Sequence, residues 1–425
     1  MLRSLRVLCA LLVVVALVPA STPLVGALES DGAGPVEQTA QVQSVTERNT
    51  TSVLLLDGET TTGYARSTVN IAPVIDATRG VVGIELRQRV VTNRLRSAST
   101  TDRRRQVLRQ ETERLAEEVA ELQRAEERAL ARYERDEISD EELLRVLASV
   151  DTEARRADEL VSVLQDEASQ VQFLTATSDQ LQSLQVELAT MYGPVRQHAG
   201  QVFRGEAPPT RVHVTVAGEA VALSVIRGNT YIREATVPAN LDLGSSDQFA
   251  SESEVITRIG ELYPWAWTSD TSSVRTYTNF ENGFYRINVD HTHGQLTSYV
   301  DGSTQNVFRE IQYKSVNRMP AGPSVAETEN GTTARVNQSF VGGPVEVRAT
   351  DAISGDPVQG TVYVDGAAVG RTVNGGLWVL GPAGQYEVTV AGEAGNVTVS
   401  ARAIQPTTSP QSGTVQPTTP PQNEQ

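Results

Sequence analysis

Glycine and proline almost vanish between residues 79 and 192, where glutamate, arginine, leucine and alanine dominate. That composition is typical of helices. Within this stretch, nine residues repeat at alternating spacings of four and three without a miss. The spacing places them along one side of a helix and predicts the seam of a coiled coil. These residues are Leu143, Leu147, Val150, Ala154, Ala157, Val161, Leu164, Ala168 and Val171.

The preceding stretch keeps the same spacing, and Ser139 lies between the two. Ser139 and Glu142 form a capping box, and Ile138 and Leu143 stand where a hydrophobic staple belongs. A loop this short predicts an antiparallel helical hairpin over 79–200. The seam of the first helix consists of Leu108, Thr112, Leu115, Val119, Leu122, Glu126, Ala129 and Tyr133, two of them polar misfits.

We expect this hairpin to project from the rest of the chain as a stiff arm. At about 1.5 Å per residue, residues 103–136 would span about 50 Å, more than the width of a small domain. Its tip near Ile138 would then be a contact site. The alternative is that both helices belong to the bundle of a globular domain.

Three consecutive arginines, Arg103, Arg104 and Arg105, follow Asp102. Cations in the first turn of a helix oppose its dipole. We therefore expect the helix to run through from about residue 79, with a kink near 97–101. The arginines then form either a solvated face or a patch for an acidic partner.

Strand signals flank the helical stretch on both sides. Residues 48–78 form a β segment around the turn pair Asp57-Gly58. Residues 201–319 combine alternating strands with one short helix over 251–263. That helix starts at a capping box of Ser251 and Glu254 and stops before Pro264. We predict a small α+β domain here, with a tight strand connection over 290–294.

The C-terminal third changes composition again. Residues 320–343 are rich in Pro, Gly, Thr and Asn and predict a linker, and 344–404 are short strands between glycine turns. Residues 405–425 have the composition of a disordered Thr/Pro-rich tail and contain no apolar segment, so we expect no C-terminal membrane anchor. The predicted fold class is therefore multidomain α+β, with an antiparallel helical (coiled-coil) hairpin, a small α+β domain and a C-terminal Ig-like β-sandwich.

The first 27 residues have the pattern of a signal peptide. Arg3 and Arg6 precede an apolar run over 7–18, and the small residues at 25–27 fit a cleavage site. The alternative is a membrane anchor, but this run of 12 residues is shorter than the ~20 that span a bilayer. Cleavage would remove Cys9, the only cysteine, and leave 28–47 as a flexible lead-in.

The charge of the chain suggests a high-salt surrounding. It carries 52 acidic and 36 basic residues, for a net charge of −16, and Lys314 is the only lysine. An acidic, lysine-poor surface suits molar salt, where screening suppresses self-repulsion, and points to a halophilic archaeon. The same charge argues against nucleic acid as a partner, because phosphate binding needs a basic face.

Few residues suggest chemistry. His291 and His293 could share one side of a strand and bind a metal, but they also suit a hairpin turn. Trp265 and Trp267 could form an aromatic binding platform or pack in a core. Without a nucleophile, phosphate-loop or zinc motif, we predict no catalytic residue, cofactor or metal. Four sequons make candidate glycosylation sites at Asn49, Asn330, Asn337 and Asn396.

Two stretches resemble known families. Residues 344–404 resemble the small β-sandwich of carboxypeptidase-regulatory-like and immunoglobulin-like surface domains, which implies a spacer or interaction module without catalytic residues. The matching residues are Thr350-Asp351, Ser354-Gly355-Asp356-Pro357-Val358-Gln359-Gly360, Val362-Tyr363-Val364, Asn374-Gly375-Gly376 and Pro382-Ala383-Gly384-Gln385-Tyr386-Glu387-Val388.

Residues 98–237 resemble a family of exported haloarchaeal proteins of unknown function, whose members often end in a membrane helix. The resemblance implies architecture and compartment but no activity. It is carried by Glu137-Ile138-Ser139, Glu142-Leu143-Leu144-Arg145, Gly193-Pro194-Val195-Arg196 and Thr230-Tyr231-Ile232-Arg233-Glu234-Ala235.

The sequence thus favours an exported, non-catalytic interaction or structural protein of the cell envelope. Its partners would be other envelope proteins or surface glycans. Two alternatives stay open: an enzyme or enzyme regulator acting through 201–319, and an extracellular protein that binds a small molecule or carbohydrate.

Overall fold

The computed structural model describes residues 52–67, 89–267, 273–280, 283–319 and 322–406. The predicted signal peptide, the lead-in, the sequon at Asn49 and most of the predicted tail lie outside the described residues. No helix in the described ranges combines the length and the apolar character needed to cross a membrane.

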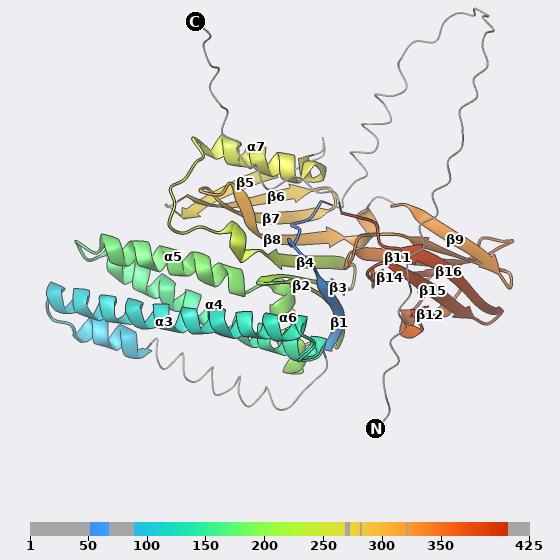
Figure 1. Ribbon diagram of the computed structural model, residues 1–425, viewed down its shortest axis with the longest axis horizontal. Coiled ribbons are helices and arrows are strands. Elements are labelled where there is room, and N and C mark those ends of the chain that lie inside the picture. The colour runs from blue at the N-terminus through green and yellow to red at the C-terminus, as the bar shows by residue number, and fades with distance from the viewer. Residues whose placement is uncertain (1–51, 68–88, 268–272, 281–282, 320–321, 407–425) are drawn as a thin grey trace, which may run out of the picture. The chain divides into compact units, whose positions relative to one another are not determined.

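A helical layer precedes most of the strands in the chain (Figure 1). After a helix over 89–97 come α3 Thr101–Glu134, α4 Asp140–Ser169, α5 Thr175–Met191 and α6 Pro194–Phe203. The predicted cap of α4 is confirmed, since the Ser139 hydroxyl accepts a hydrogen bond of 3.2 Å from the Glu142 amide. At the expected kink over 97–101 the helix breaks completely, because a helix over 89–97 ends there and α3 starts anew at the Thr100 cap; residues 79–88 lie outside the described residues.

The two predicted seams are buried in this layer, together with the polar misfits Thr112 and Glu126. The helices form a bundle, and Leu181, Leu184 and Leu188 of α5 complete its core. The projecting arm is therefore wrong, and so is the contact site at its tip. Ile138 is buried in a core shared with the sheet, because further apolar residues widen the stripe at that end; they include Leu130, Leu144 and Ala148.

The helical layer packs against an antiparallel sheet of eight strands. The strand order in this sheet is β1-β2-β3-β4-β8-β7-β6-β5. β1 comes from the predicted β segment and pairs with β2. The sheet thus joins segments from before and after the helices into one structure. The strands are β1 Thr61–Ser67, β2 Thr210–Ala217, β3 Ala220–Arg227, β4 Thr230–Thr236, β5 Ser273–Phe280, β6 Phe284–His291, β7 Gly294–Asp301 and β8 Asn306–Ser315.

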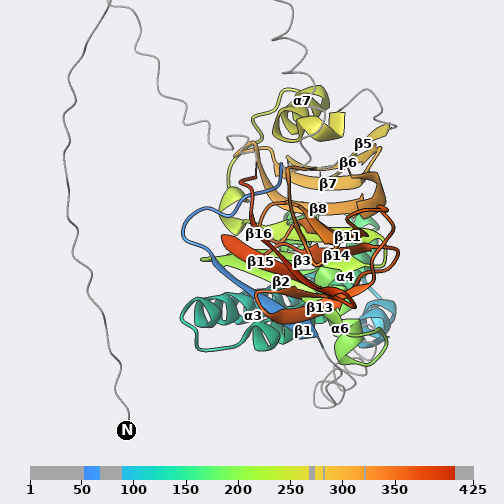
Figure 2. The ribbon, with the colours of Figure 1, turned by 90° about the vertical axis from the view of Figure 1, so that its right-hand side faces the viewer.

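Alternating side chains of the sheet face two different cores. On β3, Val221, Leu223 and Val225 pack with α3, α4 and α6, whereas Ala220 and Ala222 pack with the second core. That second core contains α7 Glu252–Leu262, the 3-10 helix η2 Pro264–Trp267 and Leu54. Figure 2 shows α7 beside β5–β7. The predicted capping box of α7 does not form, since the side chain of its N-cap accepts no cap hydrogen bond.

The C-terminal residues form a β-sandwich of two four-stranded sheets, β14-β11-β10-β9 and β13-β12-β15-β16. The prediction of a linker over 320–343 was wrong, because β9 and β10 lie within it and Ala334 and Val336 alternate into the sandwich core. The predicted multidomain α+β fold with a C-terminal sandwich is confirmed. The strands are β9 Ser324–Glu329, β10 Thr332–Asn337, β11 Pro344–Asp351, β12 Gly360–Val364, β13 Ala367–Arg371, β14 Gly376–Leu380, β15 Gln385–Gly392 and β16 Gly395–Arg402.

The sandwich contacts the large sheet through an apolar cluster that includes Tyr231, Phe340 and Leu380. The Ser224 hydroxyl donates a hydrogen bond of 2.7 Å to the carbonyl of Gly342. Gly342 has φ +73°, and a Cβ there would lie 2.6 Å from a ring nitrogen of buried His213. A glycine is therefore required where the sandwich meets β2 and β3.

Candidate functional site

The central strand pair β4 and β8 carries buried charges on both faces of the sheet. Arg233, Glu234, Arg309, Glu310 and Lys314 are all buried there. Because side chains alternate along a strand, Glu234 and Arg309 face the helices and the other three face the α7 side. A buried charge is costly unless it is paired, so each face must supply partners.

On the helical face, the Glu234 carboxylate binds the N-terminus of α6. It accepts hydrogen bonds of 2.7 Å from the Val195 amide and 3.3 Å from the Arg196 amide. Free amides and the helix dipole both favour a carboxylate at this position. A Cβ at Gly193 would collide with Glu234, so the glycine allows the helix to approach the strand.

Arg196 is the centre of this network. Its guanidinium donates to the Glu126 carboxylate at 2.7 and 2.9 Å and to the Met191 carbonyl at 2.7 Å, and it lies 3.4 Å from Glu234. Burial by itself would lower the pKa of Arg196, but Glu126, Glu234 and nearby Asp151 raise it above its ordinary value. The polar misfit in the first seam is thus the partner of a buried arginine.

Further buried charges fix the position of the turn before α6. Asp151 on α4 accepts a hydrogen bond of 2.7 Å from the Gly193 amide and pairs with Arg155 at 3.1 Å. The Tyr192 ring contacts two guanidinium groups, with Arg155 at 4.8 Å and Arg309 at 4.9 Å from its centroid. We define the helix-side network as Glu126, Asp151, Arg155, Arg196, Glu234 and Arg309; it joins α3, α4, α6, β4 and β8.

The opposite face holds a second network around Glu310. Its carboxylate pairs with Arg233 at 2.5 Å and accepts a hydrogen bond of 2.6 Å from the Leu54 amide. Arg233 donates in turn to the Leu54 carbonyl at 2.8 Å. These bonds fix the segment before β1 across the sheet.

Lys314, the only lysine of the chain, is 1% exposed on this face. Its ammonium nitrogen lies 4.1 Å from the ring centroid of Trp265. Burial lowers the pKa of Lys314 to about 7, although Glu310 acts in the opposite direction. A lysine that is partly neutral at pH 7 is the kind that acts as a base or nucleophile in enzymes, provided that substrate can reach it.

His291, His293 and Trp265, singled out in the sequence, lie near this lysine, whereas Trp267 is half-buried against the core of α7. Buried His291 meets Trp265 edge-on at 4.8 Å, and burial lowers its pKa to about 3. His293 hydrogen-bonds to the Arg318 carbonyl at 2.7 Å. Among the described residues, no three or more His, Cys, Asp or Glu side chains lie where they could together hold a metal ion. Trp265 is 1% exposed, so it is a core residue and no binding platform.

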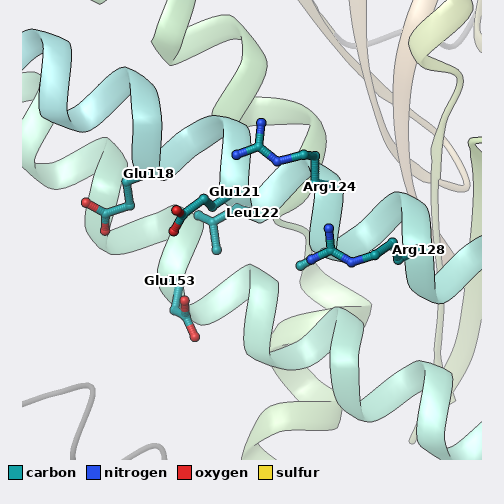
Figure 3. A pocket seen from close by; sticks show the side chains of 7 residues that line it. Glu118, Glu121, Leu122, Arg124, Arg128 and Glu153 are labelled. Carbon is teal, nitrogen blue, oxygen red and sulfur yellow. The ribbon is translucent and has the colours of Figure 1, made fainter.

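A shallow groove of about 480 Å³ lies on the outer surface of the bundle between α3 and α4. Leu122 and Ala125 line it, and Figure 3 shows its charged rim. The carboxylates of Glu118, Glu121 and Glu153 lie on one side of Leu122, and two guanidinium groups lie on the other. Those two belong to Arg124 and Arg128.

The described sequons lie on the sandwich. Asn330, in the β9–β10 turn, and Asn396 are exposed, and the Asn330 amide donates to the Asn396 carbonyl at 2.8 Å. The Asn337 amide donates to Glu346 at 2.7 Å. The side-chain amides of Asn330 and Asn337 are thus hydrogen-bonded within the sandwich, and use of the sequons stays a prediction.

Three family matches cover most of the chain. Residues 1–208 match a domain of unknown function (DUF7096), and residues 212–320 match a family of unknown function (DUF7094). Residues 323–399 match an archaeal fibronectin-III type-like domain. The C-terminal sandwich is therefore fibronectin-III-like. A search of curated proteins found no match.

The two matches of unknown function assign no activity, but they divide the helix-side network between them. Glu126, Asp151 and Arg196 lie in the first, and Glu234 and Arg309 lie in the second. The two matched regions thus share one buried set of charges.

Proposed function

We propose that this chain is an exported, non-catalytic interaction or structural protein of the cell envelope of a halophilic archaeon. The proposal has one main support in the structure. The buried charges that could otherwise serve chemistry are used to fasten one element to another, as Arg196 is to Glu126 and Glu234. The sandwich is attached to the same sheet through Phe340 and Gly342.

Such a scaffold acts through its surface. Fibronectin-III-like sandwiches serve as spacers and interaction modules, and the acidic composition suits high salt. The N-terminal sequence pattern supports export. Other envelope proteins or surface glycans are the partners that fit this setting.

Affinity capture from envelope extract at native salt tests the proposal. We expect the chain in the envelope or the medium, starting near Leu28 and recovered with other envelope components. Full-length chain starting at Met1 in the cytoplasmic fraction would contradict it. A chain captured from the cytoplasmic fraction of the same cells is the control for contamination.

Lys314 is the observation that favours an enzyme instead, and its uniqueness makes a direct test. An amine acylating reagent at pH 8 has two classes of target, the α-amino group and Lys314. Because Lys314 is 1% exposed, we expect peptide mass spectrometry to find it unmodified until the protein is unfolded. Rapid acylation of Lys314 in the folded protein would show that small molecules reach it and would favour the enzyme.

A further inference from the structure

Phe173 is unusual in both its exposure to solvent and its backbone conformation. It is 82% exposed, whereas Phe203, Phe284, Phe308 and Phe340 are buried. Its φ is +64°, in the left-handed region that a bulky side chain rarely adopts. It lies in the turn between α4 and α5, flanked by buried Leu174. Glycine would suit this backbone conformation better than phenylalanine.

The three arginines at the start of α3 meet the same turn. The Arg105 guanidinium lies 5.6 Å from the Phe173 ring and donates to the Gln172 carbonyl at 3.0 Å. Arg103 is exposed and Arg104 pairs with Glu167 at 3.2 Å. We define the knob as Phe173 with Arg103 and Arg105. An exposed aromatic ring beside arginines is the composition of an interface hot spot.

The groove of Figure 3 has the complementary chemistry. Its floor is formed by half-buried Ala125 and by the edge of buried Leu122, and its volume of about 480 Å³ is ample for a phenyl group. The carboxylates of Glu118, Glu121 and Glu153 gather on one side of it, where the guanidinium groups of a docked partner would be attracted.

We propose that the knob of one copy of this chain docks into the α3–α4 groove of a second copy. This inference rests on the proposed function, since a structural envelope protein has a use for self-assembly. The proposed contact is heterologous, in which each docked copy still offers a free knob or groove, so that the copies form rings or open chains larger than a dimer.

A net charge of −16 opposes this association at low salt. The Debye length falls from ~10 Å at 0.1 M to ~3 Å at 1 M salt, so long-range repulsion between copies is screened while burial of the ring is retained. The same net charge disfavours an anionic lipid surface as the occupant of the knob. We therefore expect assembly in molar salt and its loss on dilution into low salt.

Sedimentation of the full chain in about 2 M KCl tests the proposal through two variants. Phe173→Gly removes the knob and keeps the groove, whereas Ala125→Arg fills the groove with a cation and keeps the knob. We expect wild type to form species larger than dimers as concentration rises, and each variant alone to stay monomeric. An equal mixture of the two variants should form a dimer and stop there, because docking occupies the only working knob and the only working groove of the pair.

Circular dichroism separates loss of docking from loss of folding. Phe173→Gly should melt no lower than wild type, because glycine relieves the positive φ. Ile353→Ser is the matched control: Ile353 is 97% exposed on the sandwich, away from knob and groove, and its replacement should leave assembly unchanged.

Three results would overturn the inference. These are a wild type that stays monomeric in molar salt, a Phe173→Gly variant that assembles like wild type, and variants that fail to pair when mixed. Binding of wild type to anionic vesicles through Phe173, without self-association, would identify the lipid as the occupant instead. Self-assembly of a chain found only in the cytoplasm would leave this inference standing and reject the proposed function.

Discussion

Arg196→Met removes the only cation that bonds to both Glu126 and Glu234 in the helix-side network. Arg196 is 2% exposed and contributes three hydrogen bonds from its guanidinium. Breaking a buried ion pair from one side costs about 3–5 kcal/mol, because the remaining charge stays buried without a partner. We place the loss in that range, since Glu126 loses both of its bonds while Glu234 keeps two backbone amides.

A second variant separates the ion pair from the packing around it. Arg196→Met with Glu126→Leu removes both charges and keeps apolar volume, so it should recover most of the stability that the single variant loses. The measurement is guanidinium chloride unfolding of both variants in a Trp267→Phe, Trp378→Phe background, followed by circular dichroism for the helices and by fluorescence of buried Trp265 for the sheet core. In wild type we expect the two signals to change together, because the network joins bundle and sheet.

The reasoning fails if Arg196→Met lowers the free energy of unfolding by less than about 1 kcal/mol. It also fails if the loss in the double variant equals the sum of the losses in Arg196→Met and in Glu126→Leu alone. Separate transitions of helix and sheet in wild type would also refute it, since they would show that the two units unfold independently.

Three further predictions concern the second network, the sandwich and salt. Lys314 loses its proton near pH 7 when folded and near pH 10.4 when unfolded, so the unfolded chain binds the extra proton between these values. The free energy of unfolding should then fall as pH falls from about 10 to about 7, by up to ~1.4 kcal/mol per unit, and Lys314→Met should remove that slope in pH-dependent denaturation. A fragment of residues 322–406 should melt cooperatively, whereas 344–404 should not, because it lacks β9 and β10 and exposes Val345 and Val347; equal melts would reject the two-sheet core. The melting temperature of the full chain should rise between about 0.1 and 3 M KCl, and a flat profile would count against adaptation to salt.

Local signals predicted the helices well. The spacing from Leu143 to Val171 gave a buried helical face, and Ser139 caps α4 as expected. Spacing alone did not reveal what covers that face, because Leu130 and Leu144 lie just beside the seam and turn a hairpin into part of a bundle on a sheet.

Two predictions were wrong because a local sequence rule was applied without considering the contacts that offset it. The arginines at 103–105 were expected inside a continuous helix, yet they start α3, where Arg105 pairs with Asp102 and Arg104 with Glu167. The linker prediction gave weight to glycine, proline and asparagine and overlooked the alternation of Ala334 and Val336.

The buried networks could not be predicted from the sequence. Arg196 and Glu234 are 38 residues apart, and nothing in either segment indicates that one caps and neutralises the other. Lys314 did leave a signal: as the only lysine in a chain that uses arginine everywhere else, it marks a site where arginine was not used. The two segments of the network that carry the resemblance, Gly193–Arg196 and Thr230–Ala235, turn out to be bonded to each other.

Cross-linking mass spectrometry on intact cells in native salt, with a carboxylate-reactive reagent that does not enter the cell, tests the central claim most directly, because the chain has 52 acidic residues and a single, buried lysine. We expect linked peptides between this chain and envelope components, including second copies, and none to cytoplasmic proteins. A chain that is linked only after lysis, or only to cytoplasmic proteins, would contradict an envelope role.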